Sequence, residues 1–231
     1  MSVGRYAVYF APARDSAWWT FGAGWLGRDE IADLPLPQPC PAGFGAQDFA
    51  QLTAEPRRYG FHATLKAPFR LKSSEPAQLL ARVDALAAQL RAVPLGSLVP
   101  LYMDGFVALA PARLNPAVVQ LGARCVVELD DLRAPLSDEE VARRQPERLD
   151  ERGRDLLARY GYPHVLERLR FHMTLSGPVD AATAGRLVAH VAHPVAQLHA
   201  RQRPSLDRLC VFHESAPGQN FVRVHEAELR P

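Results

Sequence analysis

Residues 58–69 read RYGFHATLKAPF, and residues 168–179 read RLRFHMTLSGPV. The second segment follows the first at an offset of 110 residues, and six of the twelve aligned positions are identical. The identical pairs are Arg58/Arg168, Phe61/Phe171, His62/His172, Thr64/Thr174, Leu65/Leu175 and Pro68/Pro178. Because the offset is close to half of the 231 residues, the repeat predicts two lobes of similar design, each with one such segment.

Apolar and polar residues alternate in both segments, which is the pattern of a strand with one buried face. The apolar positions include Phe61 and Leu65 in the first copy and Phe171 and Leu175 in the second. The opposite face carries His62, Thr64 and Lys66 in the first copy and His172, Thr174 and Ser176 in the second. An imidazole and a hydroxyl two residues apart on a strand are separated by ~7 Å, which suits one small anion held between them.

A pseudo-twofold axis between the lobes would bring both polar faces to one cleft. There, one neutral imidazole can take a proton from water or a hydroxyl, while a second, protonated imidazole gives a proton to the leaving oxygen of a phosphodiester. We therefore expect His62 and His172 to be the catalytic pair, with the base and acid roles open between them. The expected phosphate-binding positions are Thr64, Thr174, Lys66 and Ser176. This arrangement requires neither a metal nor a cofactor.

The sequences His62-Ala63-Thr64-Leu65 and His172-Met173-Thr174-Leu175 resemble the defining motif of the two-histidine (2H) phosphoesterase superfamily. The resemblance implies a bilobal α+β fold in which two antiparallel sheets form a central groove with helices outside. It also implies cyclic phosphodiesterase or RNA end-processing activity, with the histidines as the acid/base pair and the threonines as phosphate ligands.

Four longer stretches are similar to an uncharacterised branch of that superfamily encoded within bacterial phosphonate-utilisation operons. They are RYAVYFAP at 5–12, FGAGWLGRD at 21–29, PRRYGFHATLKAPFRL at 56–71 and YGYPHVLERLRFHMTLSGP at 160–178. The resemblance implies a substrate such as a nucleoside 2′,3′-cyclic phosphate, an RNA end or a cyclic ribose phosphate from phosphonate breakdown. The motifs are further apart than in compact members, so we expect extra helical material at about 115–160.

Composition and charge narrow the class of protein. With 48% hydrophobic and 23% charged residues, the chain is ordinary for a globular protein, and its length suits a single bilobal domain over residues 1–231. A net charge of +2 does not favour binding to duplex DNA. No apolar run approaches the ~20 residues of a membrane span. Three widely spaced cysteines form no disulfide or metal pattern and favour the cytoplasm, while nothing indicates the oligomeric state.

Local patterns predict an α+β order of elements. We expect strands at 5–10, 57–71, 97–103, 106–110, 168–176, 206–213 and 220–229. We expect helices at 16–27, from Pro76 onward after Ser74 or Glu75, from Pro116 to about 133, at 138–160 and at 180–192. Asp104-Gly105 is a hairpin turn, and Asn115-Pro116 is a helix start.

Several features allow more than one interpretation. Residues 22–27 (GAGWLG) satisfy G-x-G-x-x-G, but eleven residues separate them from the preceding strand, whereas a dinucleotide-binding motif follows its strand directly. His190, His193 and His199 lack a further ligand at metal-binding spacing. Acidic residues within the arginine-rich segment 143–159 favour a solvated helix face. The tryptophans at 18, 19 and 25 are expected in the core, with base stacking as the alternative, and either Tyr6 or Tyr9 reaches the groove.

A non-catalytic function is the alternative to the phosphoesterase. The paired histidines would then be ligands only, in a module that holds a nucleotide or an RNA end. A non-catalytic partner in phosphonate metabolism is a further possibility of the same class.

Overall fold

The computed structural model describes residues 4–73 and 75–231 of the chain. Its strands are β1 (Arg5–Phe10), β2 (Arg28–Asp29), β3 (Leu34–Pro35), β4 (Ala63–Phe69), β5 (Val93–Pro94), β6 (Leu98–Met103), β7 (Phe106–Pro111), β8 (Met173–Thr174), β9 (Ser205–Leu206), β10 (Arg208–Glu214) and β11 (Phe221–Glu228). Its α-helices are α1 (Ala17–Leu26), α2 (Ala46–Leu52), α3 (Ala54–Tyr59), α4 (Pro76–Ala87), α5 (Pro116–Glu128), α6 (Asp138–Arg143), α7 (Glu151–Tyr160) and α8 (Ala181–Arg201). Three short 3-10 turns lie at 130–132, 146–148 and 166–168.

The central feature is a seven-stranded sheet with the order β11-β10-β1-β4-β8-β7-β6. All of its neighbouring strands are antiparallel, which confirms the predicted α+β class. The two expected antiparallel sheets are present as two halves of this sheet, and one residue pair, Ala63 with Met173, joins them. The two motifs therefore meet at the centre of one sheet.

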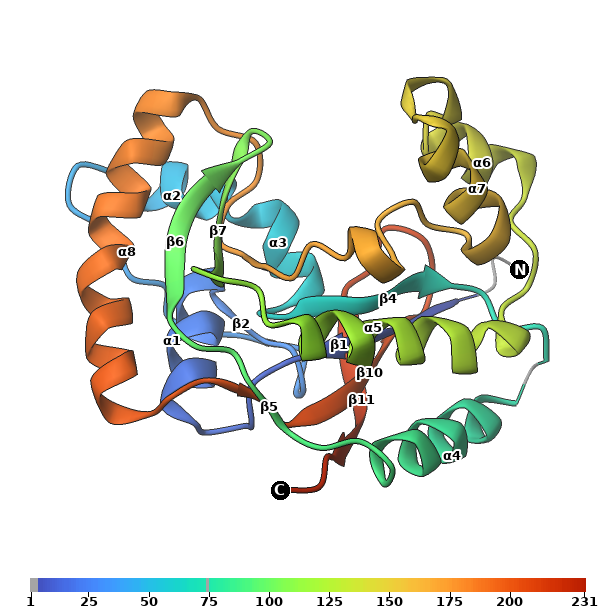
Figure 1. Ribbon diagram of the computed structural model, residues 1–231. Helices are drawn as coiled ribbons and strands as arrows, with labels where there is room; N and C mark the ends of the chain where they lie inside the picture. The colour runs from blue at the N-terminus through green and yellow to red at the C-terminus, as the bar shows by residue number, and fades with distance from the viewer. Residues whose placement is uncertain (1–3, 74) are drawn as a thin grey trace.

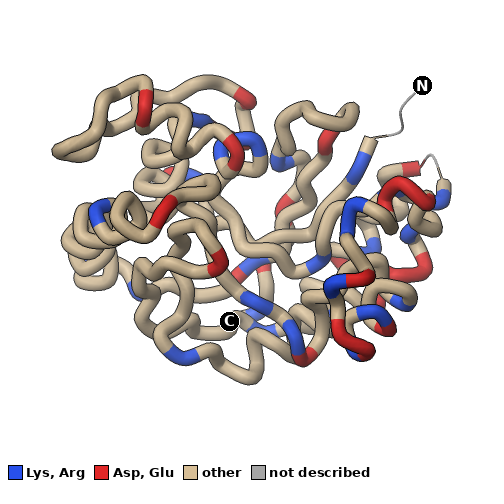
Figure 2. The backbone as a smooth tube through the Cα atoms, turned by 90° about the horizontal axis from the view of Figure 1, so that it is seen from above, with Lys and Arg blue, Asp and Glu red and all other residues tan. Residues whose placement is uncertain are grey.

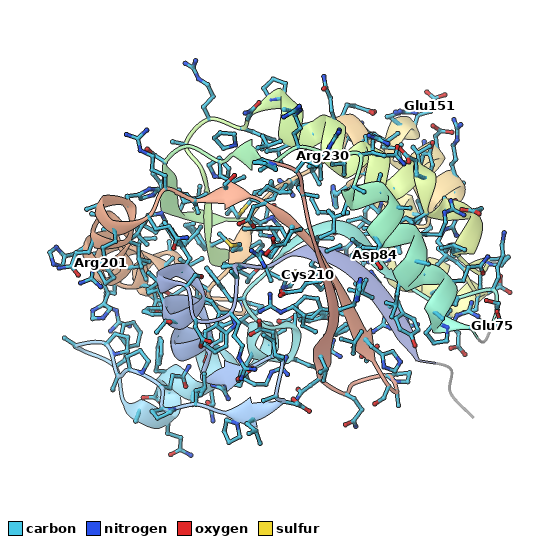
Figure 3. All side chains as sticks on the ribbon, turned by 90° about the horizontal axis from the view of Figure 1, so that it is seen from below. Glu75, Asp84, Glu151, Arg201, Cys210 and Arg230 are labelled. Carbon is cyan, nitrogen blue, oxygen red and sulfur yellow. The ribbon has the colours of Figure 1, made fainter. Side chains whose placement is uncertain are left out.

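Helices cover one face of this sheet, as Figure 1 shows. Helix α8 packs on β6 and β7, α5 packs on β4, and α4 packs on β10 and β11. Their apolar side chains join those of the strands, including Ala63 and Met173, in the main hydrophobic core. The opposite face of β1 and β10 carries a smaller cluster of buried residues: Ala7, Tyr9, Ala11, Cys210, Phe212 and Phe221. Figure 3 shows Cys210 near the centre of the molecule. His62, on the polar face of the first motif, lies against Tyr9 and Phe212 of this smaller cluster.

Most of the expected elements are confirmed. The strand at 5–10, the helix at 16–27, the helix at Pro76 and the two C-terminal strands lie where their patterns place them, while Ser74 is outside the described residues. The Asp104-Gly105 turn has φ values of 49° and 93°, as a tight hairpin requires. Asn115 caps α5 by accepting the N–H of Ala117. No described helix has both the length and the apolar character needed to span a membrane.

Four expected elements have different bounds. The helix expected at 138–160 is two helices, α6 at 138–143 and α7 at 151–160, because the chain leaves the helical conformation at Gln145, whose φ is 49°, and Pro146 then begins a 3-10 turn. The strand expected at 57–71 begins only at Ala63, because residues 54–59 form α3. The strand expected at 168–176 is a strand only at 173–174. A 3-10 turn precedes it, and after it the regular ladder ends because the N–H groups of Leu175 and Ser176 both donate to the carbonyl of Val107. Helix α8 continues past 192 to Arg201 through Pro194, because its buried face continues on both sides of the proline.

Helix α1 contacts the first motif through a glycine. A Cβ atom added to Gly22 would lie 2.0 Å from the ring of Phe61, so only glycine permits this close approach. The glycine-rich segment 22–27 therefore serves helix packing, and Gly27 ends α1 with a φ of 76°.

We predict that Gly22→Ala lowers the free energy of unfolding by about 1–3 kcal/mol, as overpacking of a core does. Gly24→Ala in the same helix is the matched control, because its added methyl group would have no atom within 4 Å. That control should raise stability by up to about 1 kcal/mol through helix propensity. Urea denaturation of both variants measures the difference, and equal effects would contradict the packing role of Gly22.

Candidate active site

The pairing of Ala63 with Met173 fixes the geometry of the candidate site. These two residues occupy equivalent positions of the repeat, so an antiparallel pair between them places a local twofold axis at the junction. Continuing the register by one residue puts His62 opposite Thr174 and Thr64 opposite His172. Opposed Cβ atoms of an antiparallel pair are ~5 Å apart, and diagonal ones are ~7–8 Å apart. The two imidazoles thus lie at diagonal corners of one small polar patch.

Burial follows the same pattern in both copies. Residues 61–67 and 171–177 show an identical series of buried and half-buried positions, with each histidine and threonine half-buried and the positions between them buried. The alternation breaks at the same place in both copies, because Lys66 and Ser176 are buried. Equivalent positions of the two copies therefore share the same degree of burial as well as similar residues.

Both histidines are held by the same local hydrogen bond. Nδ1 of His62 lies 2.9 Å from the carbonyl oxygen of Gly60, and Nδ1 of His172 lies 2.6 Å from that of Arg170. Because a carbonyl oxygen only accepts, each Nδ1 carries the hydrogen, and each neutral ring has its lone pair on Nε2. Both rings thus present the nitrogen that can accept or deliver a proton.

His62 lies against an aromatic wall. Its ring is stacked on Tyr9 with centroids 3.9 Å apart, and Tyr59 and Phe212 lie at 6.1 Å. Burial lowers the pKa of His62 to about 4, against the raising effect of the Gly60 hydrogen bond, and His172 lowers it further. His62 is therefore neutral at pH 7, and Oγ1 of Thr64 lies 3.4 Å from its Nε2.

His172 has different neighbours. Its ring lies 5.5 Å from that of Phe106, and the Arg170–Asp104 ion pair, with an N–O distance of 2.6 Å, is close by. The pKa of His172 is lowered, mainly by burial and further by the charge of Arg170. The hydrogen bond to the carbonyl of Arg170 and the charge of Asp104 oppose this shift. The two imidazoles are thus electrostatically distinct despite the symmetry of their strands.

Two adjoining cavities meet at this patch. One, of about 250 Å³, is lined by Phe106, Pro56 and Pro178 among others, and we call it the Phe106 cavity. The other, of about 480 Å³, is lined by Arg5, Arg58, Arg143 and Arg144 among others, and we call it the arginine-lined cavity. Both cavities share Glu55, Tyr59, His62 and Thr174. Thr64 lines only the arginine-lined cavity, and His172 lines neither, its ring lying beside Phe106.

Lys66 does not reach the groove, contrary to the expectation from alternation. Register shifts between β1 and β4 lie on both sides of the pair Val8–Lys66, and a bulge of this kind turns a side chain to the other face. The ammonium group of Lys66 donates to Asp130 at 2.9 Å and to the carbonyl of Val126 at 3.2 Å. Lys66 therefore fastens the motif strand to the last turn of α5 and to the 3-10 turn that follows it.

Ser176 also has a local role. Its hydroxyl donates to the carbonyl of Gly177 at 2.8 Å and accepts the N–H of Val107 at 2.9 Å. Although the residue borders the Phe106 cavity, its hydroxyl holds the end of the motif against β7.

The other aromatic and histidine candidates lie outside the patch. Trp18, Trp19 and Trp25 are buried, and their indole N–H groups donate to Gln202, Glu30 and Leu175. Tyr6 stacks on His213, so Tyr9 is the tyrosine of β1 that reaches the groove. Cys40, Cys125 and Cys210 are free thiols. Across residues 4–73 and 75–231, no three His, Cys, Asp or Glu side chains gather in a metal-binding group.

The arginines of the groove were not predicted. Arg143 and Arg144 belong to the segment expected to be a solvated helix face, yet both line the arginine-lined cavity from the end of α6. Figure 2 shows charged residues closely spaced on the side of the molecule that carries α4 to α7. The sequence shows these arginines close together. Which way their side chains face depends on how α6 and α7 pack relative to β4, and the sequence does not show that packing.

Residues 64–222 match the family described as "Protein of unknown function (DUF1045)". The chain belongs to the DUF1045 family. Two relatives are named Ribose 1,5-bisphosphate phosphokinase PhnN. The one from Janthinobacterium sp. (strain Marseille) is 38% identical over 227 residues, covering 96% of this chain and 50% of the relative. The one from Laribacter hongkongensis (strain HLHK9) is 36% identical over 220 residues, covering 94% and 50%.

The DUF1045 chain thus spans about half the length of the curated relatives it matches. A crystal structure of E. coli LigT complexed with NADP+ is similar over 100% of both chains, with a TM-score of 0.39 and 11% identity. That likeness is too low to carry a functional assignment.

We predict that Asp130→Ala lowers the free energy of unfolding by about 3–5 kcal/mol, because it leaves the buried Lys66 ammonium and the Arg133 guanidinium without the carboxylate that they share. Asp131→Ala is the matched control, since Asp131 is 61% exposed and pairs with Arg82 at the surface. The control should cost at most about 1 kcal/mol. Denaturant unfolding compares the two variants. Similar losses in the free energy of unfolding would contradict a larger stabilising role for the buried Lys66–Asp130 pair than for a surface pair.

We also predict that His62 titrates far below an ordinary histidine. Since the unfolded chain binds this proton near 6.5 and the folded protein near 4, the stability contributed by His62 is present above pH 6.5 and declines as the pH falls toward 4. Tyr9→Ala, which uncovers the ring, should raise the pKa of His62 toward 6.5. Imidazole NMR titration measures both values, and a wild-type pKa at or above 6.5 would refute the burial effect.

Proposed function

We propose that this protein is a phosphoesterase that opens a cyclic phosphodiester of a small molecule by acid/base catalysis, without a metal. The observation that carries the proposal is the antiparallel pair Ala63–Met173, which brings two His-x-Thr sequences to one face. Two imidazoles with free Nε2 atoms and two hydroxyls on one small patch are suited to a tetrahedral phosphate.

The threonines hold the phosphate in this proposal. Thr64 and Thr174 lie at the other two corners of the patch, and their hydroxyls donate to the non-bridging oxygens. Hydrogen bonds to an ionised acceptor are short and strong, so they favour the charge that develops in the transition state. Neither hydroxyl has a strong competing partner within the described residues, since the one contact, Thr64 with His62, is long at 3.4 Å.

His62 is the general base and His172 the general acid. The low pKa of His62 keeps its Nε2 free to take a proton from water, and the oxygen of that water forms the new bond to phosphorus. His172 lies at the opposite corner of the patch and gives a proton to the ester oxygen as its bond to phosphorus breaks. The bound phosphate raises the pKa of His172 by its negative charge, so that this ring enters the reaction protonated. The products are a phosphomonoester and a free hydroxyl.

The names of the relatives favour a phosphorylated ribose over other organic groups. Both relatives are named for ribose 1,5-bisphosphate, which fits a cyclic ribose phosphate or a nucleoside 2′,3′-cyclic phosphate as substrate of this chain. A kinase reaction is not favoured, because the chain contains no G-x-x-x-x-G-K-[ST] sequence: leucine precedes each of its two lysines, Lys66 and Lys72.

We predict that His62→Ala and His172→Ala each lower kcat for cyclic phosphate hydrolysis by about 10²–10⁴-fold, the usual contribution of a positioned acid or base. His193→Ala on α8, where the ring bonds Gln197 and no other described residue, should have no effect. A phosphatase-coupled screen of cyclic phosphates measures turnover, with calorimetry for ligand binding. Retained binding with no turnover in the wild type would make the protein a binding module.

We further predict a bell-shaped pH profile for kcat/KM that chelators do not change. This parameter reports the free protein, so protonation of His62 sets the acid limb near pH 4. The lowered pKa of His172 places the alkaline limb below 6.5, while the profile of kcat shifts upward because bound phosphate favours the charged ring. Loss of activity with a chelator, restored by zinc or manganese, would contradict the mechanism.

A further inference from the structure

The arginine-lined cavity has more positive charge than its own carboxylates balance. Arg5 and Arg58 both pair with Glu214, at 2.6 and 2.7 Å, so two guanidinium groups share one fully buried carboxylate. Glu140 also lines the cavity, but it is engaged by Arg70 at 2.9 Å. Neither carboxylate is therefore available to the remaining arginines of this wall. Glu55 borders both cavities and forms no ion pair within the described residues, so four arginines line this cavity against two lining carboxylates, Glu55 and Glu140.

Arg143 and Arg144 supply the unbalanced charge. Neither residue has a carboxylate partner in the part of the chain that the structure describes. The guanidinium of Arg144 lies over the ring of Tyr162, with its Cζ 4.9 Å from the centroid, which orients the group without neutralising it. Both face the His62 side of the groove across the same cavity as Arg58.

The two cavities differ in charge and polarity. The described lining of the Phe106 cavity holds no arginine or lysine; besides the shared Glu55 it has Asp104, which pairs with Arg170, and proline and phenylalanine side chains. A second anion would meet no cationic side chain there, whereas four arginines line the arginine-lined cavity, which adjoins the same His62 and Thr174. The groove is thus polarised along its length.

We propose that the substrate is a small bisphosphorylated molecule whose second phosphate binds in the arginine-lined cavity, on Arg143 and Arg144, opposite Arg5 and Arg58. This rests on the proposed function, which places the phosphate to be cleaved at His62 and Thr174. A volume of about 480 Å³ suits a phosphosugar, and the Phe106 cavity takes the remaining organic part. Arginine matches phosphate through paired N–H donors, so a second phosphate sets both affinity and orientation.

The test compares two stable ligands that differ only in the second phosphate. Adenosine 2′,5′-bisphosphate and adenosine 2′-monophosphate are titrated into the wild type, the Arg143→Gln/Arg144→Gln variant and the Arg148→Gln control by calorimetry. Arg148 is an exposed arginine of the same region that does not line the cavity, so its variant removes charge without touching the proposed subsite.

The wild type should bind the bisphosphate at least about tenfold more tightly than the monophosphate, as one added charge-assisted contact provides. The double variant should reduce this preference to within twofold while keeping its affinity for the monophosphate, which also shows that it is folded. The Arg148→Gln control should keep the preference.

Equal wild-type affinities, or a preference that survives in the double variant, would overturn the second subsite. These outcomes are independent of turnover. Hydrolysis of cyclic phosphates without a bisphosphate preference would refute the subsite and leave the phosphoesterase intact. A preference without any hydrolysis would support the subsite and refute the catalytic proposal.

Discussion

One antiparallel pair, Ala63 with Met173, determines the arrangement of the candidate site. Because these residues are equivalent in the repeat, their pairing makes the two motif strands symmetric about the junction. A shift of one residue would send the polar side chains of one strand into the core and break the patch. The apolar residues on the opposite face prevent that shift, since Ala63 and Met173 are both packed in the main core. The core therefore sets the register, and the register places the imidazoles.

The same strands also define where the patch ends. Beyond the threonines, the next polar side chain of each motif bonds within the protein: Lys66 donates to Asp130, and Ser176, which still borders the Phe106 cavity, accepts from the backbone of β7. The buried Lys66 ties the first motif to the end of α5 and to the turn after it, and α6, whose end carries Arg143 and Arg144, follows along the chain. The motif strand and the extra helices are thus mechanically linked, although they serve different parts of the proposed substrate.

Much of this arrangement could be predicted from sequence, because it follows from local alternation and from the repeat. His62, Thr64, His172 and Thr174 are on a common face since they keep the strand period through the junction. Lys66 was misplaced because a bulge depends on the neighbouring strand, which the sequence of one strand does not contain. Ser176 borders the Phe106 cavity, but the hydrogen bond of its hydroxyl to β7 has no signal in the sequence for the same reason. The helix at 54–59 was missed for a similar reason: its six residues have too few turns to show a helical period. The sequence does not show which way the side chains of Arg143 and Arg144 face, since a charged helix face has the same composition whether it faces solvent or a groove.

The strand order has a consequence for how the chain assembles. The N-terminal strand β1 lies between β4 and β10, and Arg5 pairs in register with Glu214 near the other end of the chain. Half of the sheet is therefore completed only after residues 208–228 have left the ribosome, and a topology of partners so distant in sequence folds slowly. The sequence repeat is clear, but cutting the chain between its two copies would not yield two fragments that fold alone. The half of the sheet that contains the first copy is completed by β10 and β11, which follow the second copy in the chain.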